Sequence, residues 1–138
     1  MKNIWFALLV IVAMGIFGIF AGCSNQAAIE KEIADQDADF TLQAKDLSRE
    51  YQVYHDQTDE KYYKKILEVS GPVLKVYADP GYMLIQFDTG PVMMVECYFA
   101  GTHKEELLKL SEGDEVTVKG VCKGAVKAVK LEGCSFVE

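Results

Sequence analysis

Apolar and polar residues alternate along much of the second half of the chain, which is the pattern of β-strands with one buried face. In the segment 113–124, Val116, Val118 and Cys122 lie on one side of an extended chain, and the other side is mainly polar. Glycines mark both ends of this segment, as expected for a strand between turns. The same alternation predicts four further strands, at 66–77, 82–87, 92–99 and 129–136.

Glycine interrupts two of the predicted strands. Gly71 and Pro72 break the alternation of the first strand, and the apolar residues of the last strand change sides near Gly133. Interruptions of this kind are typical of β-bulges, where a barrel strand bends from one sheet into the next. We therefore expect bulges at both positions.

A helix is predicted before the first strand. The segment 42–55 has helical spacing of its apolar residues, and Thr41 is its expected N-cap. One face of this helix carries four of them: Ala44, Leu47, Tyr51 and Tyr54. A second, short helical turn is predicted over 59–65, where Tyr62 and Tyr63 are expected to pack under the barrel.

The order of these elements indicates the fold class. Thr102 and Glu105 have the spacing of a capping box, which predicts a short helix through Leu110, between the third and fourth strands. Three meandering strands, a helix and a hairpin form the order of the OB-fold, a Greek-key barrel. We predict a mainly β, five-stranded OB-fold Greek-key barrel over 41–138, with an N-terminal helix and a short helix between strands 3 and 4.

The first residues predict an export signal. An apolar run at 4–20 follows Lys2 and leads into small residues, so we expect a signal peptide at 1–22; an uncleaved membrane anchor is the alternative. The ending Phe20-Ala21-Gly22-Cys23 resembles the lipobox of bacterial lipoproteins, although Phe20 replaces the usual Leu, Val or Ile. That resemblance implies a lipid on Cys23. We expect the protein in the bacterial cell envelope, lipid-anchored to a membrane on its extracytoplasmic side.

The chain is acidic, with a formal net charge of −7. The segment 23–40 is polar and acidic with few large apolar residues, and we interpret it as a lipidated tether. The remainder of the chain also carries more acidic than basic residues. A general nucleic-acid-binding domain would be basic, so the charge argues against that function.

The order and spacing of several short motifs resemble those of the bacterial OB-fold lipoprotein family, also described as tRNA-anticodon-binding-like. The matching residues are Leu47 and Tyr51, Tyr63-Lys64-Lys65-Ile66, Val69-Ser70-Gly71-Pro72-Val73, Val95-Glu96-Cys97-Tyr98-Phe99, Leu110-Ser111-Glu112-Gly113-Asp114-Glu115-Val116, Gly120-Val121-Cys122-Lys123-Gly124 and Leu131-Glu132-Gly133-Cys134. The resemblance covers about 42–137. It implies a fold and an envelope location, and it leaves the ligand open.

Three cysteines remain once Cys23 is assigned to lipid. An odd number permits at most one intramolecular disulfide. We favour Cys122 with Cys134, and Cys97 with Cys134 is the competing pair. Three buried thiols that pack as small hydrophobic side chains are an equal alternative. A thiol-dependent role would rest on the unpaired cysteine alone.

Nothing in the sequence predicts catalysis. There is no nucleophile motif, no phosphate-binding loop and no metal-ligand spacing, so we expect no enzyme activity, cofactor or metal. The two histidines, His55 and His103, have no sequence neighbours that suggest a triad, and His103 is expected to be exposed at a helix start.

Two surfaces are candidates for binding. OB-folds bind ligands on the face of their second and third strands. On one side of those strands the chain carries Tyr82, Leu84, Gln86, Met94, Glu96 and Tyr98, unless the N-terminal helix covers them. Around the final hairpin it carries Lys119, Lys123, Lys127 and Lys130, which form either a polyanion patch or the lysines that protect a sheet edge.

The function favoured by these patterns is non-catalytic binding. We expect a lipid-anchored extracytoplasmic OB-fold module whose partner is an envelope protein, a glycan or a small ligand. Single-stranded nucleic-acid binding is the alternative: the fold, the tyrosines and the lysines favour it, and the acidic charge opposes it.

Overall fold

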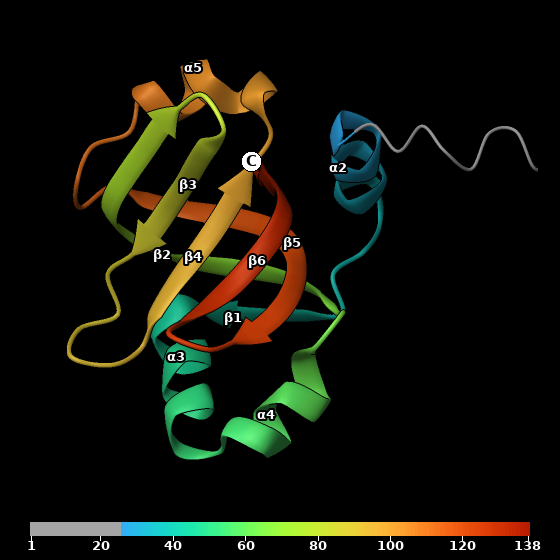
Figure 1. Cartoon of the computed structure of the whole chain (residues 1–138), viewed down its shortest axis with the longest axis vertical. Coiled ribbons are helices and arrows are strands. Elements are labelled where there is room, and N and C mark those ends of the chain that lie inside the picture. The colour runs from blue at the N-terminus through green and yellow to red at the C-terminus, as the bar shows by residue number, and fades with distance from the viewer. Residues whose placement is uncertain (1–25) are drawn as a thin grey trace, which may run out of the picture.

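The computed structural model describes residues 26–138 as a β-barrel with helices at its two ends (Figure 1). In chain order the elements are α2 (Gln26–Asp35), β1 (Phe40–Gln43), α3 (Ala44–Val53), α4 (His55–Tyr62), β2 (Ile66–Asp79), β3 (Tyr82–Phe87), β4 (Met94–Phe99), the 3-10 turn η1 (Gly101–His103), α5 (Lys104–Leu108), β5 (Glu115–Ala125) and β6 (Ala128–Phe136).

The barrel closes through five of the six strands. β2, β3 and β4 form an antiparallel meander, β4 runs parallel to β6, and β6 forms a hairpin with β5. β5 then pairs antiparallel with β2 and closes the barrel, with α5 between the third and fourth barrel strands. This is the connectivity of the OB-fold, so the predicted fold class is confirmed.

β2 pairs with two other barrel strands in turn, in addition to β1. Ile66–Pro72 pairs with β5, and Val73–Asp79 pairs with β3. The register shifts between Val73 and Lys75, so the bulge lies there and the prediction of a bulge at Gly71 is wrong. A bulge bends a strand locally, which lets one long strand belong to both halves of the barrel.

Gly71 is needed for close packing. A Cβ atom at Gly71 would lie 3.2 Å from the Cβ of Ala44 and 3.2 Å from Cδ1 of Phe87. The glycine therefore lets α3 approach the barrel closely. The bulge predicted near Gly133 is confirmed, because the β6 register advances three residues where β4 advances two, and Gly133 has a φ of +63°.

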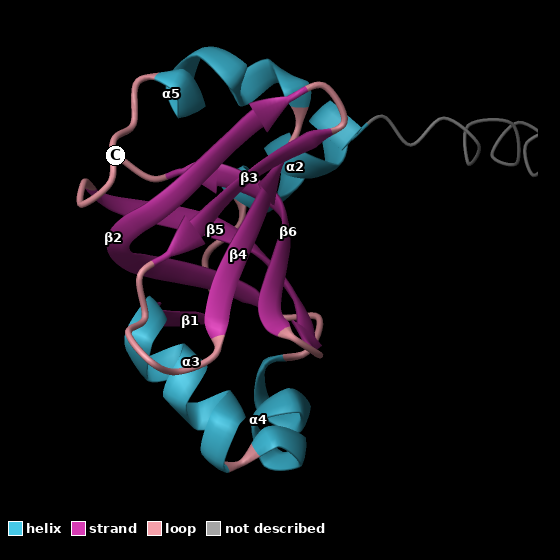
Figure 2. Cartoon of the chain, turned by 60° about the vertical axis from the view of Figure 1, so that its left-hand side comes forward, coloured by secondary structure: helices cyan, strands magenta, loops and turns pink. Residues whose placement is uncertain are grey.

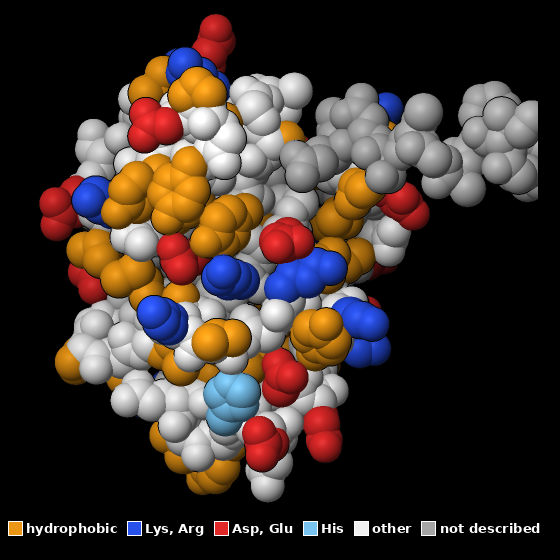
Figure 3. Space-filling model, in the orientation of Figure 1, with side chains coloured by type: hydrophobic (Ala, Val, Ile, Leu, Met, Phe, Trp, Pro, Cys, Tyr) orange, Lys and Arg blue, Asp and Glu red, His pale blue; other side chains and the backbone are white. Residues whose placement is uncertain are grey.

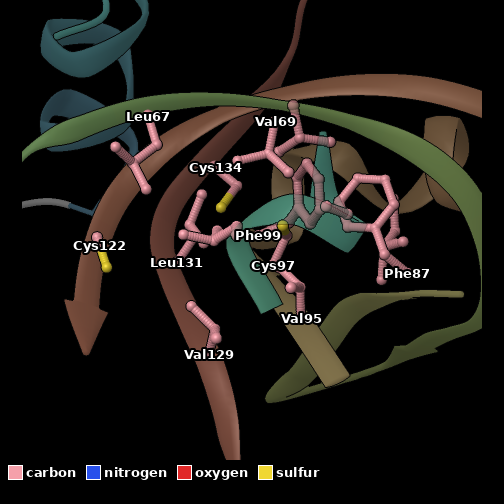
Figure 4. Packing of buried hydrophobic residues seen from close by; sticks show 14 of the residues in the cluster. Leu67, Val69, Phe87, Val95, Cys97, Phe99, Cys122, Val129, Leu131 and Cys134 are labelled. Carbon is pink, nitrogen blue, oxygen red and sulfur yellow. The ribbon is translucent and has the colours of Figure 1, made fainter. Parts of the chain in front are cut away.

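The inward residues of every barrel strand form one hydrophobic core (Figure 4). Fully buried members from different strands include Leu67, Val69, Phe87, Val95, Val129 and Leu131. These side chains alternate with outward ones along β4, as the sequence pattern predicts. Burial of side chains of this size stabilises the fold by about 1.5–3 kcal/mol each.

The helix after β1 begins later than expected. Residues 40–43 pair in parallel with β2, so Thr41 lies in a strand and the prediction that it caps a helix is wrong. Ala44, Leu47 and Tyr51 are buried as predicted. Tyr54 is 60% exposed, because it lies beyond the last residue of α3 with φ near −130°.

Two other helical predictions differ from the structure. α4 begins at His55, four residues before the predicted turn, and it buries Tyr62 but leaves Tyr63 partly exposed. The prediction of a capping box at Thr102 is wrong, because the 3-10 turn η1 precedes α5 and no side chain caps that helix. The His103 side chain forms ion pairs with Glu30 and Glu106 instead, and it is largely buried, contrary to the prediction.

Part of the predicted tether is folded. Gln26–Asp35 forms α2, which packs against β6 and β5 and buries Ile33 (Figure 2). A polar helix of this length is marginal alone, and its contacts with the barrel supply the stability. The predicted signal peptide 1–22 and the predicted lipid site Cys23 lie outside the described residues. Within 26–138, no helix is long and apolar enough to cross a membrane.

Candidate binding face and the neighbouring cleft

The six predicted face residues do share the outer side of β3 and β4. Leu84 pairs with Tyr98 across the strands, and Gln86 pairs with Glu96 and donates a hydrogen bond of 3.3 Å to its carboxylate. The inward residues between them are buried. The predicted alternation therefore holds along both strands and places all six side chains on one surface: Tyr82, Leu84, Gln86, Met94, Glu96 and Tyr98.

Tyrosine rings surround an apolar centre on this surface. Leu84 is fully buried although it points outward, and its partners across the strands are Tyr77 and Tyr98. The rings of Tyr77 and Tyr82 meet edge to face, with centroids 5.3 Å apart. Figure 3 shows hydrophobic side chains gathered over β3 and β4, with lysine or arginine side chains beside them.

Two lysines lie over the tyrosine rings. The Nζ atom of Lys75 is 4.8 Å from the Tyr77 ring centroid, and that of Lys130 is 5.7 Å from the Tyr98 ring centroid. Cation–π contacts of this kind contribute about 0.5–1 kcal/mol at exposed sites. Burial raises the pKa of Tyr98, and the nearby Glu96 carboxylate raises it further, so the phenol stays protonated at neutral pH. We call Lys75, Tyr77, Tyr82, Leu84, Tyr98 and Lys130 the tyrosine face.

Sequence reasoning missed Lys75 and Tyr77. Both lie on β2 after the bulge at Val73–Lys75, which changes the side of the sheet on which each later residue falls. The alternation of residues 73–79 indicates which side chains face outward, but only if the bulge is placed at Val73–Lys75. A bulge placed at Gly71 assigns Lys75 and Tyr77 to the wrong side of the strand.

The N-terminal helices leave the tyrosine face uncovered. α3 and α4 cover one end of the barrel, where Ser48 donates a hydrogen bond to the carbonyl of Met93 and Tyr51 contacts Cys122 (Figure 1). α2 lies beside the other end, near η1. Within 26–138, the helices therefore leave uncovered the surface that the OB-fold offers to ligands.

The four predicted lysines do not form one patch. Lys119 donates hydrogen bonds to the backbone carbonyls of Ala34 and Gln36 at the end of α2. Lys123 and Lys127 are exposed on β5 and the following turn, and Lys130 belongs to the tyrosine face. Three of the predicted lysines are therefore available to a ligand, and one holds α2.

A cleft of about 810 Å³ lies between α2 and the barrel. Ile29, Glu30 and Ile33 of α2 form one wall. The opposite wall comes from the barrel and from the turns beside it: Pro80, Gly81, Met83, Tyr98, Phe99, Lys104, Val121, Lys123 and Glu132. Tyr98 lines both the cleft and the tyrosine face, so the two surfaces are adjacent.

Glu30 is buried at the edge of this cleft. One carboxylate oxygen pairs with Nε2 of His103, whose Nδ1 lies 2.9 Å from a carboxylate oxygen of Glu106. Burial raises the pKa of Glu30, and the charge of His103 partly offsets that effect. The other oxygen of Glu30, Oε2, is buried and has no hydrogen-bond partner among the described residues.

The three cysteines of the barrel are free buried thiols, so the structure does not join Cys122 to Cys134. In the β5–β6 register Cys122 pairs with Leu131, three residues away from Cys134. The thiol of Cys122 lies 3.4 Å from the Tyr51 hydroxyl, and Cys97 is the thiol neighbour of Cys134 (Figure 4). Burial raises the pKa of both Cys122 and Cys134.

Glu30, His103 and Glu106 lie together at the edge of the cleft, but they do not form a metal site. Within 26–138, no three His, Cys, Asp or Glu residues are grouped closely enough to hold a metal ion. His55 is committed to the backbone, with Nε2 2.8 Å from the carbonyl oxygen of Ala125.

A family comparison identifies the chain. The tRNA_anti-like family model matches residues 1–135. The protein belongs to the tRNA_anti-like family. A comparison with curated proteins finds no significant match.

One solved structure shares the fold of this tRNA_anti-like protein. It is similar to a "putative nucleic acid-binding lipoprotein" from Klebsiella pneumoniae, with a TM-score of 0.61 and 13% identity over 78% of this chain and 97% of that one. It also matches a chain of the S. pombe Stn1-ten1 complex, with a TM-score of 0.40 and 17% identity over 53% of this chain and 58% of that one. At 13% identity, the similarity to the Klebsiella structure shows the fold alone. The similarity to the S. pombe chain, with a TM-score of 0.40, is too low to support a conclusion.

Proposed function

We propose that this protein is a non-catalytic OB-fold binding module that holds its ligand on the tyrosine face. The observation that carries the proposal is the group formed by the exposed Tyr82 and the half-buried Tyr77 and Tyr98 around Leu84. Aromatic rings bind planar or apolar groups with little loss of side-chain entropy, and this is the face on which OB-folds take their ligands.

We further propose that the domain acts in the bacterial cell envelope. A lipid on Cys23 would hold it to a membrane on the extracytoplasmic side, and two or more acyl chains would make that attachment stable. The support is the lipobox-like sequence ending at Cys23, together with a similar fold in a protein described as a lipoprotein. The partner would then be an envelope protein, a glycan or a small ligand.

The test is a titration of the purified protein with three probes of different chemistry. These are an oligodeoxythymidylate, a chito-oligosaccharide and a proline-rich peptide, each followed by NMR. We expect saturable shifts at Tyr82 and Tyr98 with one of them. Tyr98→Ala should weaken that binding by about tenfold or more, because a stacked ring contributes about 1–3 kcal/mol. Tyr54→Ala, which removes an exposed tyrosine from the other end of the barrel, is the control.

Hydrolysis of a probe by the intact protein would reject the non-catalytic assignment. Equal loss of binding in Tyr98→Ala and Tyr54→Ala would reject the tyrosine face as the site. Cys23→Ser should release the protein from membranes, because it removes the thiol that would carry the lipid. Membrane attachment that persists in Cys23→Ser would reject the lipid proposal.

Single-stranded nucleic acid is the second candidate ligand. Lys75 and Lys130 place positive charge directly beside rings on which bases can stack. The similar Klebsiella protein is described as nucleic acid-binding, which supports this candidate. The net charge of −7 opposes it.

Salt dependence tests this candidate. Affinity for the oligodeoxythymidylate should fall steeply as salt is raised, because phosphate contacts release counterions. Lys130→Glu should weaken binding and flatten its salt dependence. Lys45→Glu, which changes an exposed lysine of α3 away from the tyrosine face, should do neither. Absence of binding even at low salt would reject nucleic acid and leave the envelope ligands.

A further inference from the structure

The cleft between α2 and the barrel has the dimensions of a ligand pocket. Its volume of about 810 Å³ is within the usual range of small-molecule sites, which is about 300–1,000 Å³. Apolar side chains form much of the lining, and they include Ile29 and Ile33 of α2 and Met83 and Phe99 of the barrel. The lining therefore suits the apolar body of a ligand.

One polar group inside this lining has no partner. Glu30 is only 5% exposed, and its Oε2 atom accepts no hydrogen bond from any described residue. A buried polar atom left without a partner costs about 1–3 kcal/mol. A ligand that supplies a donor to Oε2 would recover that free energy when the Glu30 side chain turns this buried oxygen toward the cleft.

Charge indicates which donor fits best. Glu30 and Glu132 both line the cleft, and so do Lys104 and Lys123. The two lysines are exposed, where water and salt screen their charges, whereas Glu30 is buried and acts at a low local dielectric. His103 is paired with one oxygen of Glu30 and Oε2 has no donor, so a ligand group beside Oε2 gains more as a positively charged N–H donor than as a neutral one.

We propose that this cleft is a second binding site, which takes a small molecule with an apolar body and a protonated amine that donates to Oε2 of Glu30. The apolar body packs between Ile33 and Phe99, and the amine reaches the carboxylate at the edge of η1. The site adjoins the tyrosine face and shares Tyr98 with it, but its ligand would be held by Glu30 of α2, which is not part of that face.

Three probes with the same aromatic body test the chemistry. Phenethylamine carries the amine, 2-phenylethanol carries a neutral hydroxyl, and 3-phenylpropionate carries a carboxylate. We expect phenethylamine to bind at least about tenfold more tightly than the other two, because hydrogen bonds to charged groups contribute more than neutral ones. NMR shifts of the Ile33 and Met83 methyl groups would report binding at the cleft. Equal binding of the carboxylate, or no binding of any probe, would overturn the proposal.

Variants of α2 locate the amine. Glu30→Gln should reduce the affinity for phenethylamine by about tenfold or more, and Glu32→Gln, which changes an exposed acid on the same helix, should leave it unchanged. Equal affinity in Glu30→Gln and the parent protein would overturn the proposal.

Glu30→Gln could act by releasing α2 from the barrel, and faster amide exchange at Ile33 would show such a release. A second variant, which does not change α2, keeps the test decisive in that case. Val121→Phe fills the barrel wall of the cleft and leaves the pair of Glu30 with His103 in place. We expect it to abolish the binding of phenethylamine. Undiminished binding in Val121→Phe would place the ligand elsewhere and overturn the proposal.

Discussion

The ammonium group of Lys119 on β5 donates a hydrogen bond of 2.8 Å to the backbone carbonyl of Gln36, one residue after α2. A second bond of 3.3 Å reaches the carbonyl of Ala34. Positive charge at the C-terminal end of a helix interacts favourably with the helix dipole. Lys119 therefore attaches α2 to the barrel, and it is unavailable to an anionic ligand.

Removal of this lysine should loosen α2. We expect Lys119→Met to weaken the docking of the helix by about 0.5–1 kcal/mol and to speed amide exchange in 26–35, while exchange in the barrel strands stays slow. Lys127→Met, in the exposed turn between β5 and β6, is the matched control. Unchanged exchange of α2 in Lys119→Met would contradict the assignment.

Gly120 should tolerate no side chain. A Cβ atom there would lie 2.6 Å from the sulfur of Cys134 and 3.1 Å from the carbonyl oxygen of Glu132. We expect Gly120→Ala to lower the free energy of unfolding by about 1–3 kcal/mol in urea denaturation, as overpacked cores do. Gly101→Ala, where nothing lies within 4 Å of the added Cβ, should change it by less than about 0.5 kcal/mol.

A double variant tests the cause of that loss. Because Cys134 supplies the closest atom, Cys134→Ala should cost less in the Gly120→Ala background than it does alone. Additive losses would show that the sulfur contact is not responsible.

The hydroxyl of Tyr51 should stabilise the join between α3 and the barrel. It donates a hydrogen bond of 3.2 Å to Asp59 on α4 and lies 3.4 Å from the thiol of Cys122 on β5. We expect Tyr51→Phe to lower the free energy of unfolding by about 0.5–1.5 kcal/mol. Tyr54→Phe removes an exposed hydroxyl from the same helix end and should have no measurable effect. Equal losses in the two variants would contradict this role.

Stability should decrease in alkaline solution. Burial raises the pKa of the Cys122 and Cys134 thiols above that of an unfolded thiol, which is about 8.5. Above that pH the unfolded chain releases protons that the folded chain retains, so the free energy of unfolding falls as pH rises. We expect full stability below about pH 8.5 and a loss of about 1.4 kcal/mol per pH unit for each thiol above it.

Urea denaturation in the presence of a reductant, at several pH values from neutral to about 9.5, measures this loss. The double variant Cys122→Ala, Cys134→Ala should have a flatter profile over the same range. An equal slope in the double variant would show that other groups cause the alkaline instability.

The parts of the fold that the sequence predicts are those set by neighbouring residues. The strand Tyr82–Phe87 has the predicted bounds, because its alternation is local and turns flank it on both sides. The outward side of β3 and β4 follows from the same alternation. Local pattern therefore placed the tyrosines of the candidate face, Tyr82 and Tyr98.

The parts that it misses depend on contacts between distant residues. β1 has only four residues, and its parallel pairing of Phe40 with Leu67 leaves no local signature. The helical pattern of α2 is weak, and the helix is held by Lys119 from the far end of the chain. Tyr77 joins the face because a bulge shifts the register of β2, and one residue of slip moves every later side chain to the other side.

The pairings of β2 within the barrel also determine when the barrel can close during folding. Ile66–Pro72 pairs with β5, and Ile66 itself meets Val121 near the C-terminal end of the chain. Until β5 is available, this edge of β2 is open to other chains, and exposed strand edges promote aggregation. Such distant pairings also make folding slow. A chain that stops before Glu115 would retain the open edge, so its solubility, rather than its ligand, would be the first property lost.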